Sequence, residues 1–329
     1  MEAIDGHRVI MREPGGPEVL RYETCTVPAP GPDEALIRHT AIGLNYIDLH
    51  HRTGRYPLPR YPSPIGLEAA GVVEAVGAGV RGLAVGDRVA YSAPPIGAYA
   101  DRRCMPVAPL VPLPATISDE LAAGILTKGL TAHYLIFATY VVKPGDTILV
   151  HAAAGGVGLI LTQWAAQRGA TVIGTVGTDE KAALARAHGC AHAIVYTRED
   201  FVARVRDITG GKGVPVVYDS VGKDTFEGSL SCLAPRGLLA SFGTASGPIP
   251  PLDLFRLNTL GSLYVTSPAF VTHTSERGEL LGRARDLFDA IARGIVKMTV
   301  SNRYPLPEAA RAQEDLRNRR TTGVSILVP

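Results

Sequence analysis

The residues whose types and spacing most clearly suggest a chemical function lie at 146–158, where a short apolar run ends in small residues. Ile148, Leu149 and Val150 form the apolar run, and most of the following residues up to 158 are Ala or Gly. A helical pattern comes next and stops at Gly169. A strand, a glycine-rich turn and a helix together form a cradle for the pyrophosphate of a dinucleotide. Glycines let the backbone approach the phosphates, and the helix N-terminus offers free N–H groups.

The usual dinucleotide fingerprint is Gly-x-Gly-x-x-Gly, whereas this chain has Ala153-x-Gly155-x-x-Gly158. A tight strand-to-helix turn that only packs a core is the alternative. The flanking sequence favours the nucleotide site, because a turn at 143–146 precedes the strand and a second strand at 171–176 follows the helix at βαβ spacing. We expect the cofactor to contact Ala154, Gly155, Gly156, Val157 and Gly158.

Length and composition restrict the class of protein. A chain of 329 residues with 46% hydrophobic residues is expected to be globular with two domains. The formal net charge is +2 and no Lys/Arg run stands out, which argues against a nucleic-acid-binding surface. We find no apolar stretch of about 18 residues and no signal-peptide core, so no membrane span is expected. The widely spaced Cys25, Cys104, Cys190 and Cys232 are interpreted as free thiols of a cytoplasmic protein.

Two patterns divide the chain. Residues 1–115 show short apolar stretches between Pro and Gly turns, which predicts a β-rich, barrel-like module. Residues 116–140 have a helical pattern that starts at Ser118. Strands then alternate with helices, and six strands with helical crossovers predict an α/β fold with a doubly wound parallel sheet. The expected strands are 148–150, 171–176, 193–195, 214–218, 237–242 and 262–266; a helix at 279–293, a helix at 308–318 and a strand at 324–327 follow.

A second group of polar residues lies in the first module. Asn45, Tyr46, Asp48 and Tyr56 occur within an otherwise apolar region. An ordinary loop followed by a helical turn is the alternative to a site. The adjacent His50 and His51 point in different directions on a helix, so they are poorly placed to share a metal, and we expect both at the surface.

Several blocks of sequence, in order, resemble the medium-chain dehydrogenase/reductase superfamily, and specifically its zinc-free quinone oxidoreductase (zeta-crystallin-like) branch. The resemblance covers essentially the whole chain. It implies a GroES-like substrate domain over 1–125 and 266–329 and a Rossmann NADPH-binding domain over 126–265, with the site in the cleft between them. The blocks that carry it are 15–20, 41–48, 66–72, 86–89, 128–131, 151–158, 174–178, 217–222 and 261–266.

The zinc ligands of related alcohol dehydrogenases have no equivalents in this chain. Their Gly-His-Glu block, whose His binds catalytic zinc, is replaced by Gly66-Leu67-Glu68. The ligand Cys would lie at 43–46, where there is no Cys, and the four-cysteine lobe at 91–107 retains only Cys104. Tetrahedral zinc needs three or four N, S or O ligands. We therefore predict no metal.

The choice of cofactor depends on the end of the second strand. NAD enzymes usually carry an acid there, about 20 residues beyond the glycines, to hold the ribose 2′-OH. Here the strand ends at Gly177 and Thr178, and Asp179 comes slightly later, as part of a helix cap. In the resembled family a Lys at the place of Lys181 faces the 2′-phosphate, and Tyr196 lines the same pocket. A solvated helix residue is the alternative for Lys181. We predict NADPH, with Asp179 as the counterargument.

The resemblance implies further cofactor contacts. Arg319 is expected to reach the cofactor, with Arg320 as the competing candidate. The other residues expected beside the cofactor are Thr131, Tyr134, Ser220, Phe242, Gly243, Thr244, Ser267, Pro268 and Phe270.

The missing electrophile points in the same direction as the resemblance. A quinone needs less help than a ketone because its product is aromatic, so we predict an NADPH:quinone oxidoreductase that transfers a hydride or single electrons without zinc. Asn45, Tyr46, Asp48 and Tyr56 would line the nicotinamide end, with Tyr46 as the orienting or proton-donating group. An enoyl or alkenal reductase is the enzymatic alternative, and an NADPH-binding structural or RNA-binding protein is the alternative from another class. The family suggests a homodimer that pairs around 261–265.

Overall fold

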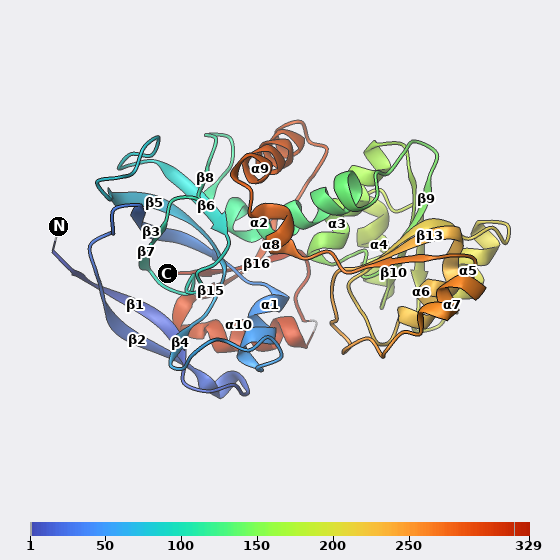
Figure 1. Cartoon of the computed structure of the whole chain (residues 1–329), viewed down its shortest axis with the longest axis horizontal. Coiled ribbons are helices and arrows are strands. Elements are labelled where there is room, and N and C mark those ends of the chain that lie inside the picture. Colours follow the sequence, from blue (N-terminus) through green and yellow to red (C-terminus); the bar gives the residue numbers. More distant parts are fainter. Residues whose placement is uncertain (1, 319) are drawn as a thin grey trace. The chain divides into compact units, whose positions relative to one another are not determined.

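The structure is a computed structural model that describes residues 2–318 and 320–329. The chain divides into two compact units (Figure 1). Unit 1 comprises Met1–Thr127, Ser275–Phe288 and Met298–Pro329, and unit 2 comprises Lys128–Thr274 and Asp289–Lys297.

Unit 2 is built on a six-stranded parallel sheet with the order β11-β10-β9-β12-β13-β14. The order reverses between β9 and β12, which is the doubly wound arrangement of dinucleotide-binding folds. The predicted fold class is confirmed in this unit. The strands are β9 (Thr147–Val150), β10 (Thr171–Val176), β11 (His192–Val195), β12 (Val214–Asp219), β13 (Leu233–Ser241) and β14 (Tyr264–Thr266).

Helices connect these strands and cover the sheet. The interior strands are almost wholly buried, as expected where helices pack on both faces. The crossover helices are α3 (Gly156–Gln167), α4 (Asp179–Ala187), α5 (Phe201–Ile208), α6 (Phe226–Cys232) and α7 (Leu254–Thr259), and α8 (Phe270–Thr274) follows the last strand. The core of the unit contains Leu149, Ile173, Ile194, Val217, Phe226 and Leu239. The short helices α7 and α8 were not expected from the sequence, because neither is long enough to show a helical period.

Unit 1 is β-rich, as predicted. One sheet has the order β2-β1-β4, and the other has the order β15-β16-β3-β5-β6-β8, with β7 also paired to β3. The C-terminal strand β16 pairs antiparallel with β3, so the end of the chain rejoins this module. The strands are β1 (Ile4–Met11), β2 (Leu20–Val27), β3 (Glu34–Gly43), β4 (Ser63–Pro64), β5 (Glu68–Val76), β6 (Arg88–Ser92), β7 (Arg102–Pro106), β8 (Val111–Pro112), β15 (Val300–Pro305) and β16 (Val324–Val328).

The remaining helices are α1 (Tyr46–Arg52), α2 (Asp119–Tyr134), α9 (Arg277–Ala292) and α10 (Ala309–Arg317). Helix α2 begins where the sequence predicts, because the Ser118 hydroxyl accepts a hydrogen bond from the Leu121 N–H at 3.2 Å. It continues as a π-helical turn, Leu135–Thr139. By length and mean hydropathy the continuous helix Asp119–Thr139 passes the test for a membrane span, yet 72% of its apolar window is buried in the folded chain. That burial is typical of a core helix.

Candidate active site

The residues predicted to bind the cofactor follow the carboxyl ends of the parallel strands of unit 2. The glycine-rich turn follows β9, Gly177 follows β10, Ser220 follows β12, Phe242 follows β13 and Ser267 follows β14. Because the strands are parallel, all these loops leave the same edge of the sheet. Ligands of open α/β sheets bind at this edge, at the point where the strand order reverses.

The turn after β9 brings backbone unusually close to backbone. Gly155 donates its N–H to the carbonyl of Ala152 at 2.8 Å and immediately precedes α3. Ala152 has a φ of +51°, an uncommon conformation for a residue with a side chain. A Cβ at Gly158 would overlap the carbonyl oxygen of Ala152, so this position requires glycine. Gly155 and Gly156 are partly or fully exposed at the start of α3, where free N–H groups can meet an anion.

A buried network of polar side chains adjoins this turn. His151 places Nδ1 2.8 Å from the Thr175 hydroxyl and Nε2 3.0 Å from the Ser229 hydroxyl. Ser229 donates to Asp219 Oδ2 at 2.8 Å. The network ties together the ends of β9, β10 and β12 and helix α6. Burial lowers the pKa of His151, an effect that Asp219 partly offsets.

The loop after β10 carries the groups predicted to choose the cofactor. Thr178 caps α4 by accepting a hydrogen bond from the Lys181 N–H at 3.3 Å, as the sequence indicates. Tyr196 is 44% exposed, and its hydroxyl lies 3.0 Å from the position that a Cβ on Gly177 would occupy. Tyr196 therefore lies against the loop after β10, at Gly177, and this loop leads into the first turn of α4, which contains Lys181.

Asp179, the counterargument to NADPH, is engaged by an arginine. Arg198 donates from Nη1 to Oδ2 at 2.6 Å and from Nη2 to Oδ1 at 2.5 Å. This bidentate hydrogen bond lowers the pKa of Asp179 and raises that of Arg198. Both oxygens of the acid thus have a cationic partner.

The loops after β12 and β13 adjoin as well. A Cβ on Gly243 would lie 2.8 Å from the carbonyl oxygen of Ser220, and Phe242 donates its N–H to the Asp219 carbonyl at 2.9 Å. Phe242, Gly243 and Thr244 are half-buried. These contacts bring Ser220 together with the residues that follow β13.

Two other predicted contacts lie on α2. Tyr134 is 2% exposed and stacks on His273 of α8, with ring centroids 4.3 Å apart and planes at 8°. Thr131, one turn earlier, is 7% exposed. The stack holds α8, whose first residue is Phe270, against α2. Ser267 and Pro268 precede α8.

In unit 1, two of the four predicted catalytic residues, Asn45 and Asp48, are buried and held by hydrogen bonds within the fold. Asn45 precedes α1 and donates from Nδ2 to Glu68 Oε2 at 2.6 Å. Asp48 is fully buried, and its Oδ2 accepts from the Asn45 N–H at 2.9 Å and from the Tyr99 hydroxyl at 3.0 Å. These bonds position the start of α1.

The other two predicted catalytic residues are exposed tyrosines. Tyr46 is 39% exposed and donates its hydroxyl to the Leu316 carbonyl at 3.3 Å. Tyr56 is 42% exposed and packs edge-on against His50, with centroids 5.0 Å apart. The expectation that both histidines are surface residues is wrong, since His51 is 7% exposed and His50 is half-buried. Helix α1 turns His51 inward with Asp48 and Arg52.

The remaining predictions concern the C-terminal arginines and metals. Arg319 lies outside the described residues. Arg320 donates to Asp315 Oδ1 at 3.3 Å. Within residues 2–318 and 320–329, no three His, Cys, Asp or Glu side chains lie close enough to hold a metal ion. The four cysteines are free thiols.

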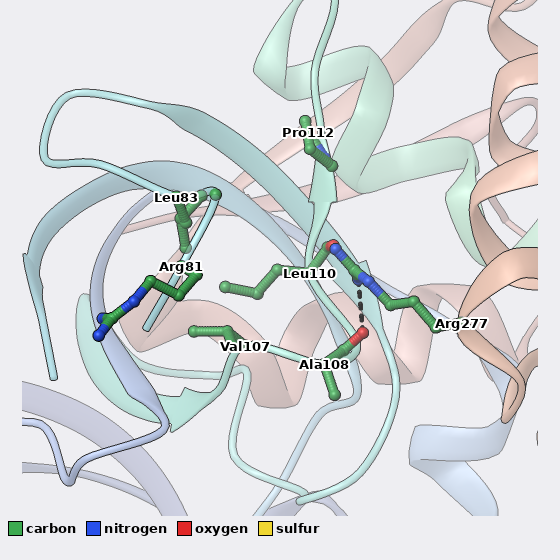
Figure 2. Close-up of a pocket in the computed structure, with 8 residues that line it drawn as sticks. Arg81, Leu83, Val107, Ala108, Leu110, Pro112 and Arg277 are labelled. Carbon is green, nitrogen blue, oxygen red and sulfur yellow. Dashed lines mark hydrogen bonds between the residues drawn. The ribbon is translucent and has the colours of Figure 1, made fainter. Parts of the chain in front are cut away.

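A small cavity of about 120 Å³ lies elsewhere in unit 1 (Figure 2). Arg277 reaches into it and donates to the carbonyls of Ala108 at 2.5 Å and Leu110 at 2.6 Å. Figure 2 shows the guanidinium of Arg81 pointing away from that of Arg277. The cavity contains none of the predicted site residues, and its inward-facing arginine is engaged by the backbone.

Glu68 and Arg198 are two residues of these networks whose roles were not expected from the sequence. Glu68 binds Asn45 and also accepts from the Thr127 N–H at 2.6 Å. The sequence feature that could have indicated this role is a carboxylate in an otherwise apolar block. Arg198 had a weaker signal, because a residue that far from Asp179 in sequence becomes its neighbour only when β10 and β11 pair.

Comparison with known proteins agrees with this architecture. Residues 31–149 match the family described as the alcohol dehydrogenase GroES-like domain, and residues 156–284 match the one described as zinc-binding dehydrogenase. A quinone oxidoreductase of Pseudomonas aeruginosa is 50% identical over 96% of this chain and 97% of its own length. A 2-haloacrylate reductase of Burkholderia is 46% identical over 97% of this chain and 98% of its own. The structure of Escherichia coli quinone oxidoreductase complexed with NADPH matches with a TM-score of 0.96 and 47% identity, covering 98% of this chain and all of the other.

Proposed function

The chain belongs to the quinone oxidoreductase family of the medium-chain dehydrogenases/reductases, and on that premise we propose that it oxidises NADPH and reduces a quinone. The observation that carries the proposal is the set of loops at the carboxyl edge of the six-stranded sheet, together with 50% identity to a quinone oxidoreductase over nearly the whole chain.

NADPH fits the residues of unit 2. The half-buried Gly156 and Val157, the first residues of α3, offer their N–H groups to the pyrophosphate. Lys181 and Tyr196 bind the 2′-phosphate. Asp179 would repel this phosphate, but Arg198 forms a bidentate ion pair with it. Phe242, Gly243 and Thr244 contact the cofactor after β13, and Ser267, Pro268 and Phe270 do so after β14. When bound, NADPH supplies the hydride, and the protein supplies its position.

The residues of unit 1 take the acceptor. We assign substrate contact to the exposed Tyr46 and Tyr56, with the Tyr46 hydroxyl orienting the quinone or donating a proton to its oxygen. Asn45 and Asp48 position the start of α1, because their polar groups bind Glu68 and Tyr99 within the fold. Because the side chain of Asp48 has no exposed surface, we assign Asp48 a positioning role in place of the expected place at the nicotinamide end.

Reduction of an activated alkene is a second candidate. The 46% identity to a 2-haloacrylate reductase over nearly the full chain favours it specifically. The same hydride would go to a carbon of the alkene, and the cofactor site would be unchanged. The shape of the acceptor site would separate the two activities.

The test is NADPH oxidation, followed by absorbance, with a para-quinone, an ortho-quinone, an α,β-unsaturated ketone and a simple aldehyde. We expect turnover with the quinones and little or none with the aldehyde, because a simple carbonyl needs an electrophilic catalyst. Turnover with the enone alone would move the enzyme to alkene reduction. Tight NADPH binding without turnover of any acceptor would contradict both proposals.

We also propose that the protein is a cytoplasmic homodimer. The free cysteines support a reducing compartment. The dimer is supported by β14, which lies at the edge of the six-stranded sheet. Leu254 and Phe255 in α7 and Tyr264 in β14 are 75%, 69% and 61% exposed, and a partner would cover such apolar side chains.

A further inference from the structure

We propose that Arg198 is a specificity-determining residue, and that its ion pair with Asp179 allows the site to accept the 2′-phosphate of NADPH. The inference rests on the proposed use of NADPH. Arg198 acts through Asp179 by cancelling its charge and occupying both of its oxygens.

The geometry joins the two loops residue by residue. The Tyr196 hydroxyl lies against Gly177, the Thr197 hydroxyl donates to the Gly177 carbonyl at 3.2 Å, and Arg198 makes its bidentate bond to Asp179. Three consecutive residues after β11 therefore contact the loop after β10. The guanidinium of Arg198 thus reaches Asp179 from the segment that follows β11.

The charges explain why the acid needs a partner. Asp179 is the first residue of α4, just beyond the strand end where an acid normally selects NAD by binding the ribose 2′-OH. Glu180 follows it, so Lys181 shares the first turn with two carboxylates. Arg186 on the same helix also lowers the pKa of Asp179, but as the smallest of the effects that act on it. Arg198 is thus the main counter-charge to Asp179.

The occupied oxygens matter as much as the charge. A free Asp179 carboxylate would both repel a phosphate and accept a hydrogen bond from an unmodified ribose hydroxyl. Arg198 removes both effects at once, because each carboxylate oxygen already accepts a short hydrogen bond. Loss of Arg198 is therefore expected to weaken the binding of NADP⁺ but not that of NAD⁺, whereas a general weakening of the site would lower both affinities.

The pair contributes little to folding. The side chains of Arg198 and Asp179 are 57% and 66% exposed, and exposed ion pairs stabilise proteins only weakly. Variants at either position should fold. A matched control is Arg303, which makes an exposed bidentate pair with Glu120 in unit 1 at 2.9 and 2.6 Å.

The experiment measures equilibrium binding of NADP⁺ and NAD⁺ to the full chain by isothermal titration calorimetry at low salt. Arg198→Ala should weaken NADP⁺ binding by about threefold or more without weakening NAD⁺, as expected for one charge near a phosphate in water. Arg198→Lys should retain most of the preference. Arg198→Ala combined with Asp179→Asn should recover NADP⁺ affinity, and Arg303→Ala should behave as wild type.

Equal weakening of both cofactors in Arg198→Ala, or no recovery in the double variant, would overturn the role of Arg198 while leaving the NADPH assignment standing. A wild-type protein that binds NAD⁺ more tightly than NADP⁺ would overturn the cofactor assignment itself and this inference with it.

Discussion

Single buried polar residues determine how the first module presents its exposed tyrosines. Glu68 has no exposed surface and bridges the Asn45 side chain and the Thr127 N–H. Asp48 bridges the Asn45 N–H and the Tyr99 hydroxyl. A buried carboxylate is costly unless its oxygens are paired, and these pairs fix the loop before α1 in one conformation. Tyr46 and Tyr56 therefore project from a rigid support.

A pH effect is expected from another buried polar residue, His39. The side chain is 3% exposed, and both ring nitrogens are hydrogen-bonded. Nδ1 lies 2.7 Å from the Ala100 carbonyl oxygen, and Nε2 lies 3.0 Å from the Tyr91 hydroxyl. Burial lowers the pKa of His39 to about 4, whereas an unfolded His titrates near 6.5. The unfolded chain therefore binds the proton more readily between these values, and stability falls as the pH falls through this window. Acidification from about pH 7 to 5 should cost about 2 kcal/mol at this site.

The measurement is urea unfolding of the full chain at both pH values, for wild type and His39→Gln. Gln cannot titrate, so the loss of stability on acidification should be about 2 kcal/mol smaller in the variant. An identical loss in both proteins would show that His39 does not carry the effect.

Among the secondary-structure elements of unit 2, the β9–α3 turn requires glycine at a position next to the expected cofactor. A Cβ at Gly158 would overlap the Ala152 carbonyl oxygen and approach the Ala153 backbone to 2.9 Å. Backbone atoms cannot swing aside as a side chain can. Gly158→Ala should therefore destabilise unit 2 by about 1–3 kcal/mol and weaken NADPH binding.

Thermal unfolding and fluorescence titration with NADPH check this prediction. Gly282→Ala in α9 is the control, because a Cβ there meets nothing within 4 Å and alanine favours a helix by about 1 kcal/mol. If Gly158→Ala unfolded and bound NADPH like wild type, the close approach would be unimportant.

The elements were predictable to the extent that their patterns are local. The apolar strands and the glycine spacing of the turn are written in neighbouring residues, and the six-stranded sheet is confirmed. The burial of His51 was missed because the inward face of a helix as short as α1 depends on what packs against it. The Asp179–Arg198 pair was missed because strand pairing, rather than sequence proximity, brings β10 and β11 together. The roles assigned to the site residues remain predictions.

For the whole molecule, the open edge of the six-stranded sheet predicts self-association. An exposed edge strand flanked by apolar side chains tends to pair with another chain. Leu254→Asp combined with Phe255→Asp should convert the proposed dimer to a monomer, because the introduced charges would be buried without partners in the proposed interface.

Light scattering coupled to size-exclusion chromatography gives the mass directly, with Val141→Asp as a control at another exposed apolar position, 51% exposed. A wild-type monomer would contradict the proposed dimer. A dimer that persists in the double variant would place its interface elsewhere.

We propose that this molecule passes a hydride from NADPH to a quinone without a metal. The most direct measurement is kcat/KM for a para-quinone with NADPH and with NADH, using enzyme treated with chelator and analysed for zinc. We predict full activity at substoichiometric zinc and a clear preference for NADPH. Activity that is lost on chelation and restored by zinc, or a preference for NADH, would contradict the account.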